Sequence, residues 1–297
     1  MRSPHGFRWS SKPPDPRRPR TLPFAQGQSM RLALLKLARN TKTRVAAFAM
    51  TAVLGATAAH ADEAQAKTLL KAMSDYLAAQ KAISFEYDTN LEIVTTQQQK
   101  LGLASSGTMT INRPDKIRAT RSGGFANVES VFDGKTLTLL SKNANLYTQV
   151  EVPGTIDHLV DELRDKYHRP LPAADLLSSD VYGELMPFVV DVKDLGSGVI
   201  LGVECDHLAF RTKEVDWQIW IAQGDRPYPC RYVITSKKIT GLPQYTVDVR
   251  NWKTGTEVAS DDFSFKAPAD AKKLKLSDLR DIGELPGIFA PKGKPQE

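Results

Sequence analysis

"ISFEYDTNLEIV", residues 83–94, decides the fold, because apolar and polar side chains alternate along it. An extended strand sends successive side chains to opposite faces of a sheet, so this pattern indicates one buried face and one wet face. Such alternation is typical of an antiparallel sheet. The buried set would be Ile83, Phe85, Tyr87, Thr89, Leu91 and Ile93.

Similar short segments recur on both sides of this stretch and are separated by turn residues. Asp133-Gly134 and "KNAN" have the chemistry of hairpin turns. We therefore predict an α+β fold, mainly antiparallel β, with one sheet of about eleven strands that curls into an incomplete barrel. The other predicted strands are 101–112, 116–122, 126–133, 135–141 and 146–150, followed by "FVVDVKDL", "GVILG", "VECDHLAFR", "VDWQIWIA", "CRYVITSKKI", "QYTVDVRNW" and "DDFSFKAP".

Two stretches have a helical period instead. Residues 64–80 place Leu69, Met73, Tyr76 and Leu77 on one side of a helix. The pattern becomes helical again between 155 and 187, where Thr155 is a predicted N-cap. We predict an N-terminal helix and a mid-chain helical lid, which must bury their apolar sides against the curled sheet. The lid residues are Leu176, Leu177, Val181, Tyr182, Leu185 and Met186.

The positive charge of the chain lies in its leader. The whole chain of 297 residues has a formal charge of +6 and a pI near 9.2. Residues 1–61 hold 11 of the 40 basic residues and only one of the 34 acidic ones, so the remainder is mildly acidic. This distribution argues against nucleic acid as a partner.

That leader has the layout of an export signal. From Met30 a basic stretch precedes an uncharged run, which ends in a small-x-small site suited to cleavage between Ala61 and Asp62. The uncharged run is too short and too rich in alanine for stable membrane insertion. Ala56 stands where a lipoprotein would need cysteine, so we expect a soluble periplasmic product.

The expected organisation follows from this leader. Residues 1–29 are disordered or reflect a start codon placed too far upstream, and residues 30–61 form the signal peptide. Residues 62–275 form the half-barrel domain, and the Pro/Gly-rich residues 276–297 form a loose tail.

The chain has two cysteines, Cys205 and Cys230, and an exported chain meets oxidising surroundings. A disulfide is the leading interpretation, while two buried free thiols and a reactive pair stay open. The predicted strand 216–222 would lie between the two cysteines and hold their Cα atoms roughly 10 Å apart, beyond the bridging limit of about 7 Å. The prolines of "GDRPYPC" offer a bend that would bring Cys230 back.

No metal, cofactor or catalytic motif stands out. Cys205 and His207 share a strand face, but zinc needs three or four ligands and the chain beyond the leader adds only His158 and His168. The motifs G-x-S-x-G and H-E-x-x-H are absent from the sequence. A hydrolase would require Asp206 and His207, or Asp157 and His158, to meet a serine.

The segment "DWQIWI" places Trp217 and Trp220 on opposite faces of one strand. Neither face is then simply solvated. Either one face is core and the other a pocket wall, or both are core.

Several stretches together resemble a bacterial family of predicted periplasmic proteins of unknown function. They are "VFDGKTLTLL", "LPAADLLSSD", "LGVECDHLAFR", "VDWQIWI", "RPYPCRYVIT" and "FSFKAPADAKKL", and the resemblance spans about residues 64–275. Cys230 departs from the family pattern. In architecture this family is similar to periplasmic lipoprotein carriers of the LolA/LolB type, and "GTMTINRPDKIRAT" resembles a strand-turn-strand of those carriers. The resemblance implies an incomplete barrel that holds acyl chains under a helical lid, with no catalytic residues to transfer.

We therefore predict a non-enzymatic protein that binds a hydrophobic small molecule, a lipid or lipoprotein acyl chains in the half-barrel. The alternatives are a sensor that binds a periplasmic or inner-membrane protein, and a hydrolase. The predicted ligand contacts are Phe85, Tyr87, Leu91, Trp217 and Trp220 on the sheet and Leu176, Leu177, Val181, Tyr182, Leu185 and Met186 on the lid.

Overall fold

The structure is a computed structural model that describes residues 45–124, 126–167 and 173–275. The chain divides into two units, Met1–Thr51 and Ala52–Glu297. Within the first unit, the described residues 45–51 are helical. The second unit contains the sheet and its helices.

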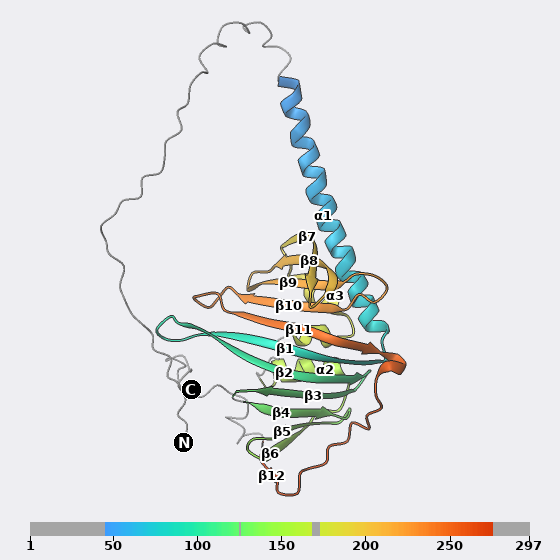
Figure 1. The fold of residues 1–297 in the computed structure, drawn as a ribbon, viewed down its shortest axis with the longest axis vertical. Helices are drawn as coiled ribbons and strands as arrows, with labels where there is room; N and C mark the ends of the chain where they lie inside the picture. Colours follow the sequence, from blue (N-terminus) through green and yellow to red (C-terminus); the bar gives the residue numbers. More distant parts are fainter. Residues whose placement is uncertain (1–44, 125, 168–172, 276–297) are drawn as a thin grey trace, which may run out of the picture. The chain divides into compact units, whose positions relative to one another are not determined.

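Twelve strands form one open sheet in the order β12-β6-β5-β4-β3-β2-β1-β11-β10-β9-β8-β7 (Figure 1). Neighbouring strands are antiparallel, except for β12 and β6, which are parallel. The predicted antiparallel sheet of about eleven strands is therefore confirmed, with a two-residue strand added at one edge. The strands are β1 Ala82–Val94, β2 Lys100–Asn112, β3 Lys116–Gly123, β4 Asn127–Phe132, β5 Thr136–Ser141, β6 Leu146–Glu151, β7 Asp191–Ile200, β8 Val203–Arg211, β9 Val215–Ala222, β10 Pro229–Ser236, β11 Gln244–Thr254 and β12 Lys272–Lys273.

Strand β1 is the stretch whose alternation predicted the sheet, and it lies in the middle of it. It pairs with β2 along its whole length, with Ile83 opposite Ile111 and Leu91 opposite Leu103. On its other side it pairs with β11, although the 149 residues 95–243 separate the two strands in the chain. The central strand thus joins the early and late halves of the sequence.

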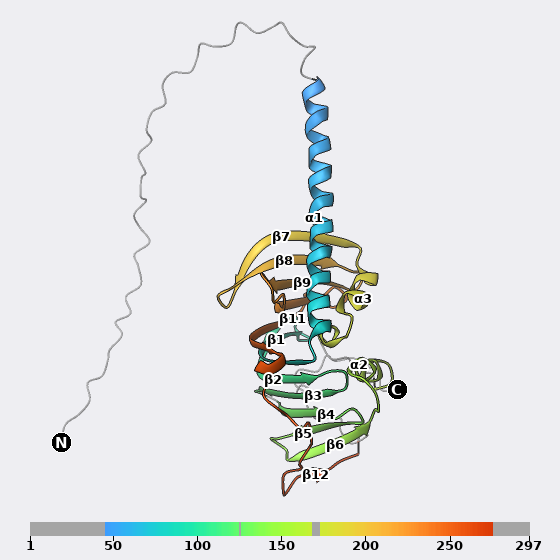
Figure 2. The same ribbon diagram turned by 90° about the vertical axis from the view of Figure 1, so that its right-hand side faces the viewer.

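The helices α1, α2 and α3 pack on one face of the sheet, which we call the helical face (Figure 2). The opposite face is the outer face. Helix α1 buries Ala66, Leu70, Met73 and Leu77 completely, which confirms the amphipathic helix predicted over residues 64–80. The helices are α1 Val45–Ala79, α2 Ile156–Asp165 and α3 Val181–Leu185, with short 3-10 turns η1 Ala174–Leu177, η2 Met186–Phe188 and η3 Gly255–Glu257.

Two apolar cores lie on the helical face. The first core joins α1 and α3 to strands β7–β10, and the second core joins α2 to strands β1–β5. The first core consists of Ala66, Leu70, Met73, Leu77, Val181, Val192, Leu208, Phe210, Trp217, Ile219, Ile221 and Tyr232. The second core consists of Ile83, Ile111, Ile117, Phe132, Leu137, Val152, Ile156 and Leu159.

The predicted mid-chain helices form as short pieces. Thr155 is the N-cap of α2, as predicted, and its hydroxyl accepts a hydrogen bond from the backbone N–H of His158 at 3.2 Å. The second part of the segment divides into η1, α3 and η2, because Asp180 starts a new helix by accepting from Gly183. These three short elements, residues 174–188, are the lid.

Two predicted strand assignments are wrong. "FVVDVKDL" and "GVILG" do not form separate strands, since β7 runs through both and absorbs a bulge at Gly196, whose φ is +81°. "DDFSFKAP" is not a strand, because Asp261 and Asp262 accept hydrogen bonds from the nearby backbone N–H groups of Phe263 and Ser264. The irregular segment 258–271 instead crosses the outer face and leads into β12, and we call it the strap.

Several leader and tail predictions lie outside the described residues, namely those for residues 1–29, 30–44 and 276–297. Helix α1 is continuous across Ala61 and Asp62, so cleavage there stays a prediction. Within the described residues, none of the helices has both the length and the hydrophobicity to cross a bilayer.

Candidate functional site

The helical face presents most of the predicted contact residues in apolar surroundings. Trp217 on β9 is 2% exposed and stacks on Phe210, with ring centroids 3.9 Å apart. Phe85 on β1 packs against the second core and stacks on Trp252 at 5.3 Å. Because Trp252 also contacts the first core, these aromatic rings join the two cores.

The lid covers both cores. Val181 is fully buried in the first core, while Leu177 packs against the second. Four further lid side chains pack against the first core but remain half-buried: Leu176, Tyr182, Leu185 and Met186. The structure therefore brings all six predicted lid residues onto the helical face.

Tyr87 and Leu91 also point to the helical face, but they belong to neither core. The Tyr87 hydroxyl donates to the Thr120 carbonyl at 2.7 Å, and burial raises the pKa of Tyr87 to about 12. Its ring lies over Gly107, where a Cβ atom would come within 2.6 Å of it and 1.9 Å of the Thr120 oxygen. Tyr87 thus packs against the backbone of β2 and β3, outside both cores.

Trp220 lies on the outer face, so it does not form one surface with Trp217 and the lid. The predicted opposite orientation of the two tryptophans is confirmed, because alternate residues of β9 face opposite sides. Trp220 stacks on His207 with centroids 3.9 Å apart, and the Arg231 guanidinium lies 5.8 Å from its ring centre. Whether Trp220 contacts a ligand stays a prediction, and such a contact would lie on the outer face.

The lid is attached to the rest of the domain by a few side-chain hydrogen bonds. Arg113, in the turn after β2, donates to the carbonyls of Leu177 at 2.9 Å and Ser178 at 3.3 Å. The Ser74 hydroxyl of α1 accepts from the backbone of Tyr182 at 3.0 Å. Asp157 of α2 accepts from the backbone and the hydroxyl of Ser179, the latter at 2.6 Å.

Sequence reasoning missed Arg113. Its side chain is half-buried, and its Nε is a buried polar atom without a hydrogen-bond partner within the described chain. Burial lowers the pKa of Arg113, and the charge of Asp157 opposes that shift. The only signal in the sequence is a basic residue directly after the apolar end of a strand, between Ile111 and Pro114.

The histidines and carboxylates considered for catalysis are engaged elsewhere. The His207 Nε2 lies 2.9 Å from the Gln218 Oε1, and Asp206 accepts from Gln223 at 2.8 Å. Asp157 meets a serine, Ser179, but Ser179 is exposed and the contact holds the lid. Across residues 45–124, 126–167 and 173–275, no three metal-ligating side chains gather.

Both cysteines are buried as free thiols on the outer face. Cys205 on β8 pairs with Ala222 on β9, and Cys230 lies at a bulge of β10. Strand β9 lies between the strands of the two cysteines, as the sequence predicted, yet both cysteines belong to one buried cluster with Ala222. The disulfide is not formed here and stays a prediction.

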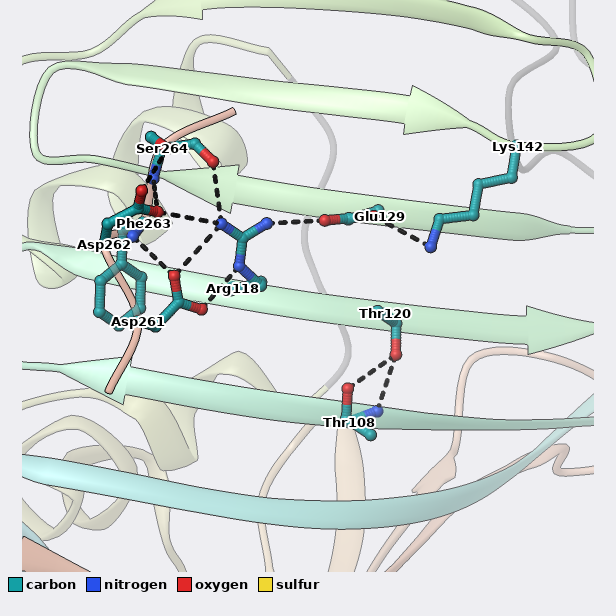
Figure 3. Close-up of polar contacts among 9 residues, drawn as sticks. All are labelled: Thr108, Arg118, Thr120, Glu129, Lys142, Asp261, Asp262, Phe263 and Ser264. Carbon is teal, nitrogen blue, oxygen red and sulfur yellow. Dashed lines mark hydrogen bonds and ion pairs between the residues drawn. The ribbon is translucent and has the colours of Figure 1, made fainter. Parts of the chain in front are cut away.

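The outer face of strands β3–β5 carries a polar network instead of a core (Figure 3). Arg118 donates to Asp261 at 2.6 Å, to Glu129 at 2.7 Å and to the Ser264 carbonyl at 2.9 Å, and Lys142 lies 2.9 Å from Glu129. Burial raises the pKa of Glu129, but Lys142 and Arg118 outweigh it and hold that pKa below its ordinary value. The network thereby fixes the strap.

A hollow of about 450 Å³ lies between these strands and the strap. Its carboxylates, Glu129 and Asp262, are already partnered within the network. It is lined by Arg118, Glu129, Leu140, Lys142, Asn145, Asp262, Ser264, Phe265, Lys266 and Pro268.

One open, mainly antiparallel sheet carries a helix and a helical lid on one face, which is the architecture of an incomplete barrel. Residues 66–277 match the family model of "Predicted periplasmic protein (DUF2092)", so the chain belongs to this family. The resemblance noted in the sequence and the periplasmic location are thereby confirmed at family level. A comparison with curated proteins gives no match.

Solved structures with a similar fold are distant in sequence. An uncharacterised conserved protein from Thermus thermophilus is 13% identical with a TM-score of 0.40, and covers 71% of this chain and 99% of that one. The MucA/MucB complex of Pseudomonas aeruginosa gives 16% and 0.40, with 68% and 62% covered. The lipoprotein LppX of Mycobacterium tuberculosis gives 11% and 0.38, with 64% and 96% covered.

Proposed function

We propose that this protein binds a hydrophobic ligand, such as a lipid or the acyl chains of a lipoprotein, on the helical face of its half-barrel. The observation behind the proposal is the lid. It consists of short helices with half-buried apolar side chains, it spans both cores, and a few side-chain hydrogen bonds hold it to α1, α2 and the β2–β3 turn.

Binding would exchange lid contacts for ligand contacts. Burial of apolar surface is worth about 25 cal/mol per Å², so a few hundred Å² of acyl chain supplies several kcal/mol. Displacing the lid costs part of that amount, because Leu176, Leu185 and Met186 leave the first core. The net free energy of binding is the gain from burying the ligand minus the cost of displacing the lid. A net value of this size suits reversible transfer.

The proposed role involves no bond-making chemistry. The polar groups near the lid, Arg113, Ser74 and Asp157, each bind backbone or hydroxyl groups of the lid itself. Their arrangement supports positioning of the lid.

The test combines native mass spectrometry of periplasmic material with displacement of a neutral fluorescent probe. Met186→Glu puts a charge at a half-buried lid position, and we expect it to abolish the co-purifying lipid and to weaken probe binding at least tenfold. Phe188→Glu is the matched control, since this neighbour is 69% exposed and should leave binding unchanged. Equal behaviour of the two variants, or absence of any lipid and probe binding, would refute the proposal.

A partner-binding sensor is the second candidate, and the edge strand β7 favours it. β7 has a neighbour on one side only, and Val190, Leu195, Val199 and Leu201 in and beside it are 47% to 65% exposed. Exposed apolar edge strands are sites where another chain can add. Cross-linking of periplasmic or inner-membrane proteins to wild type but not to Val199→Lys would favour this role.

A further inference from the structure

We propose that the hydrophobic ligand has an anionic head group, a carboxylate or a phosphate, and that Arg113 is the residue that binds it. This inference rests on the proposed function and adds the chemical class of the ligand.

The charge of Arg113 is not neutralised by direct contact. In the parts of the chain that the structure describes, Arg113 makes no ion pair, and its two hydrogen bonds go to neutral carbonyls of Leu177 and Ser178. Asp157 is the carboxylate whose charge raises the pKa of Arg113, but both oxygens of Asp157 already accept hydrogen bonds from Ser179. A half-buried cation with neutral acceptors only is a favourable site for an anion.

The Nε of Arg113 gives a second, independent indication. This N–H is buried and has no acceptor, and a buried donor without an acceptor costs free energy. Carboxylate and phosphate oxygens match the donor fork of a guanidinium and can accept from two of its nitrogens at once. One donor of this guanidinium, the Nε–H group, is therefore free to bind an anion oxygen.

The position of Arg113 fits a head group at the boundary of an apolar surface. The residue follows Ile111 of the second core and reaches the lid at Leu177, which packs on that core. A chain lying on the helical face would extend over the two cores while its head group stays beside the guanidinium.

The chemistry of the head group affects how easily the lid opens. When the lid leaves, Arg113 loses both carbonyl acceptors and would be left with at least three unsatisfied N–H groups beside an apolar surface. An anion restores those bonds and pairs with the charge, whereas a neutral head group restores them only in part. Anionic amphiphiles should therefore open the lid at lower concentration than neutral ones with the same chain.

The test compares three compounds with one tail: oleate, oleyl phosphate and oleyl alcohol, each displacing a neutral fluorescent probe from the full periplasmic protein. For wild type we expect at least tenfold tighter binding of one or both anions than of the alcohol. In Arg113→Met, which keeps the apolar stem, this ratio should fall to about one while alcohol binding stays within threefold of wild type. Because the ratio is measured within one variant, a general loss of stability does not imitate the result.

Arg211→Met is the matched control, because Arg211 lies on the outer face of β8 and makes an exposed ion pair with Asp216 of β9. It should keep the wild-type preference for anions. Equal binding of anions and alcohol by wild type, or an unchanged ratio in Arg113→Met, overturns the assignment while leaving the proposed function standing. Absence of binding for all three compounds refutes the proposed function and this inference with it.

Discussion

The helical face and the outer face belong to the same strands, yet their stabilising interactions differ. On the helical face, Leu70, Leu208 and Ile219 are completely buried, and apolar contact supplies most of the free energy. On the outer face of β3–β5, Arg118, Glu129 and Asp261 are each about one-fifth exposed and make directed, charged hydrogen bonds. The two faces therefore differ in how much movement they allow without loss of stability.

Apolar contact has no preferred direction, so a lid can slide, or a ligand can replace it, at moderate cost. Charged hydrogen bonds depend on distance and angle, so the strap they hold has one position. A binding surface on the helical face and a fixed support on the outer face agree with this difference.

Leu70→Ala should produce the largest loss of stability. Leu70 is fully buried between α1 and the sheet, and truncation of such a side chain costs roughly 4 kcal/mol through lost burial and the cavity left behind. Urea unfolding measures the change. Lys71→Ala is the control, because Lys71 makes an exposed ion pair with Asp75 and should leave the free energy of unfolding nearly unchanged. Similar losses in both variants would show that α1 is not anchored by its apolar side.

The two cysteines test whether the outer face also holds a covalent link. The bulge at Cys230 and the small side chain of Ala222 bring the thiols together across β9, so we expect a disulfide in protein exported to an oxidising compartment. A disulfide that closes the loop between Cys205 and Cys230 should stabilise the fold by about 3 kcal/mol relative to the reduced protein.

Intact mass under non-reducing conditions should be lower by two hydrogens than after reduction. Unfolding with and without reductant gives the stability difference, and Cys205→Ser should behave like the reduced protein under both conditions. Two alkylatable thiols in freshly exported protein would show that the pair stays free.

Arg118→Met tests the directed contacts of the outer face, and its effect should be the smallest of the three. The change removes bonds to Asp261, Glu129 and the Ser264 carbonyl from a mostly covered network, which we expect to cost about 1–2 kcal/mol and to expose the strap to protease. Limited proteolysis and urea unfolding measure the two effects. Lys238→Met, at an exposed ion pair, should change neither.

The effect of Arg118→Met should also depend on pH. Lys142 and Arg118 hold the folded-state pKa of Glu129 below 4.5, so the contribution of Glu129 is fully present above that value. It is lost as the pH falls through the lower folded-state pKa, where Glu129 becomes protonated. The variant and the wild type should therefore differ less in stability in that acid range, and a constant difference would count against the network.

Much of the fold could be predicted because the spacing of apolar side chains, turn residues and caps is clear within individual segments of this chain. The alternation at 83–94, the turn at Asp133-Gly134 and the cap at Thr155 act over a few residues, and all three are found. The strap could not be predicted, because "DDFSFKAP" alternates like a strand while its aspartates bind their own backbone. Arg113 was missed for a related reason, since its lid acceptors at Leu177 and Ser178 lie more than sixty residues further along the chain.

Side-chain periods and composition within single segments were enough to predict the antiparallel sheet, the amphipathic helix and the apolar lid. The export leader has the same kind of signal and stays a prediction. Only the tertiary structure decided that β1 lies beside β11, that the lid and Trp217 share one face while Trp220 lies on the other, and that Arg113 meets the lid. Alternation separates the two faces of a strand, but it does not say which face the helices will cover. That choice depends on contacts between residues distant in sequence.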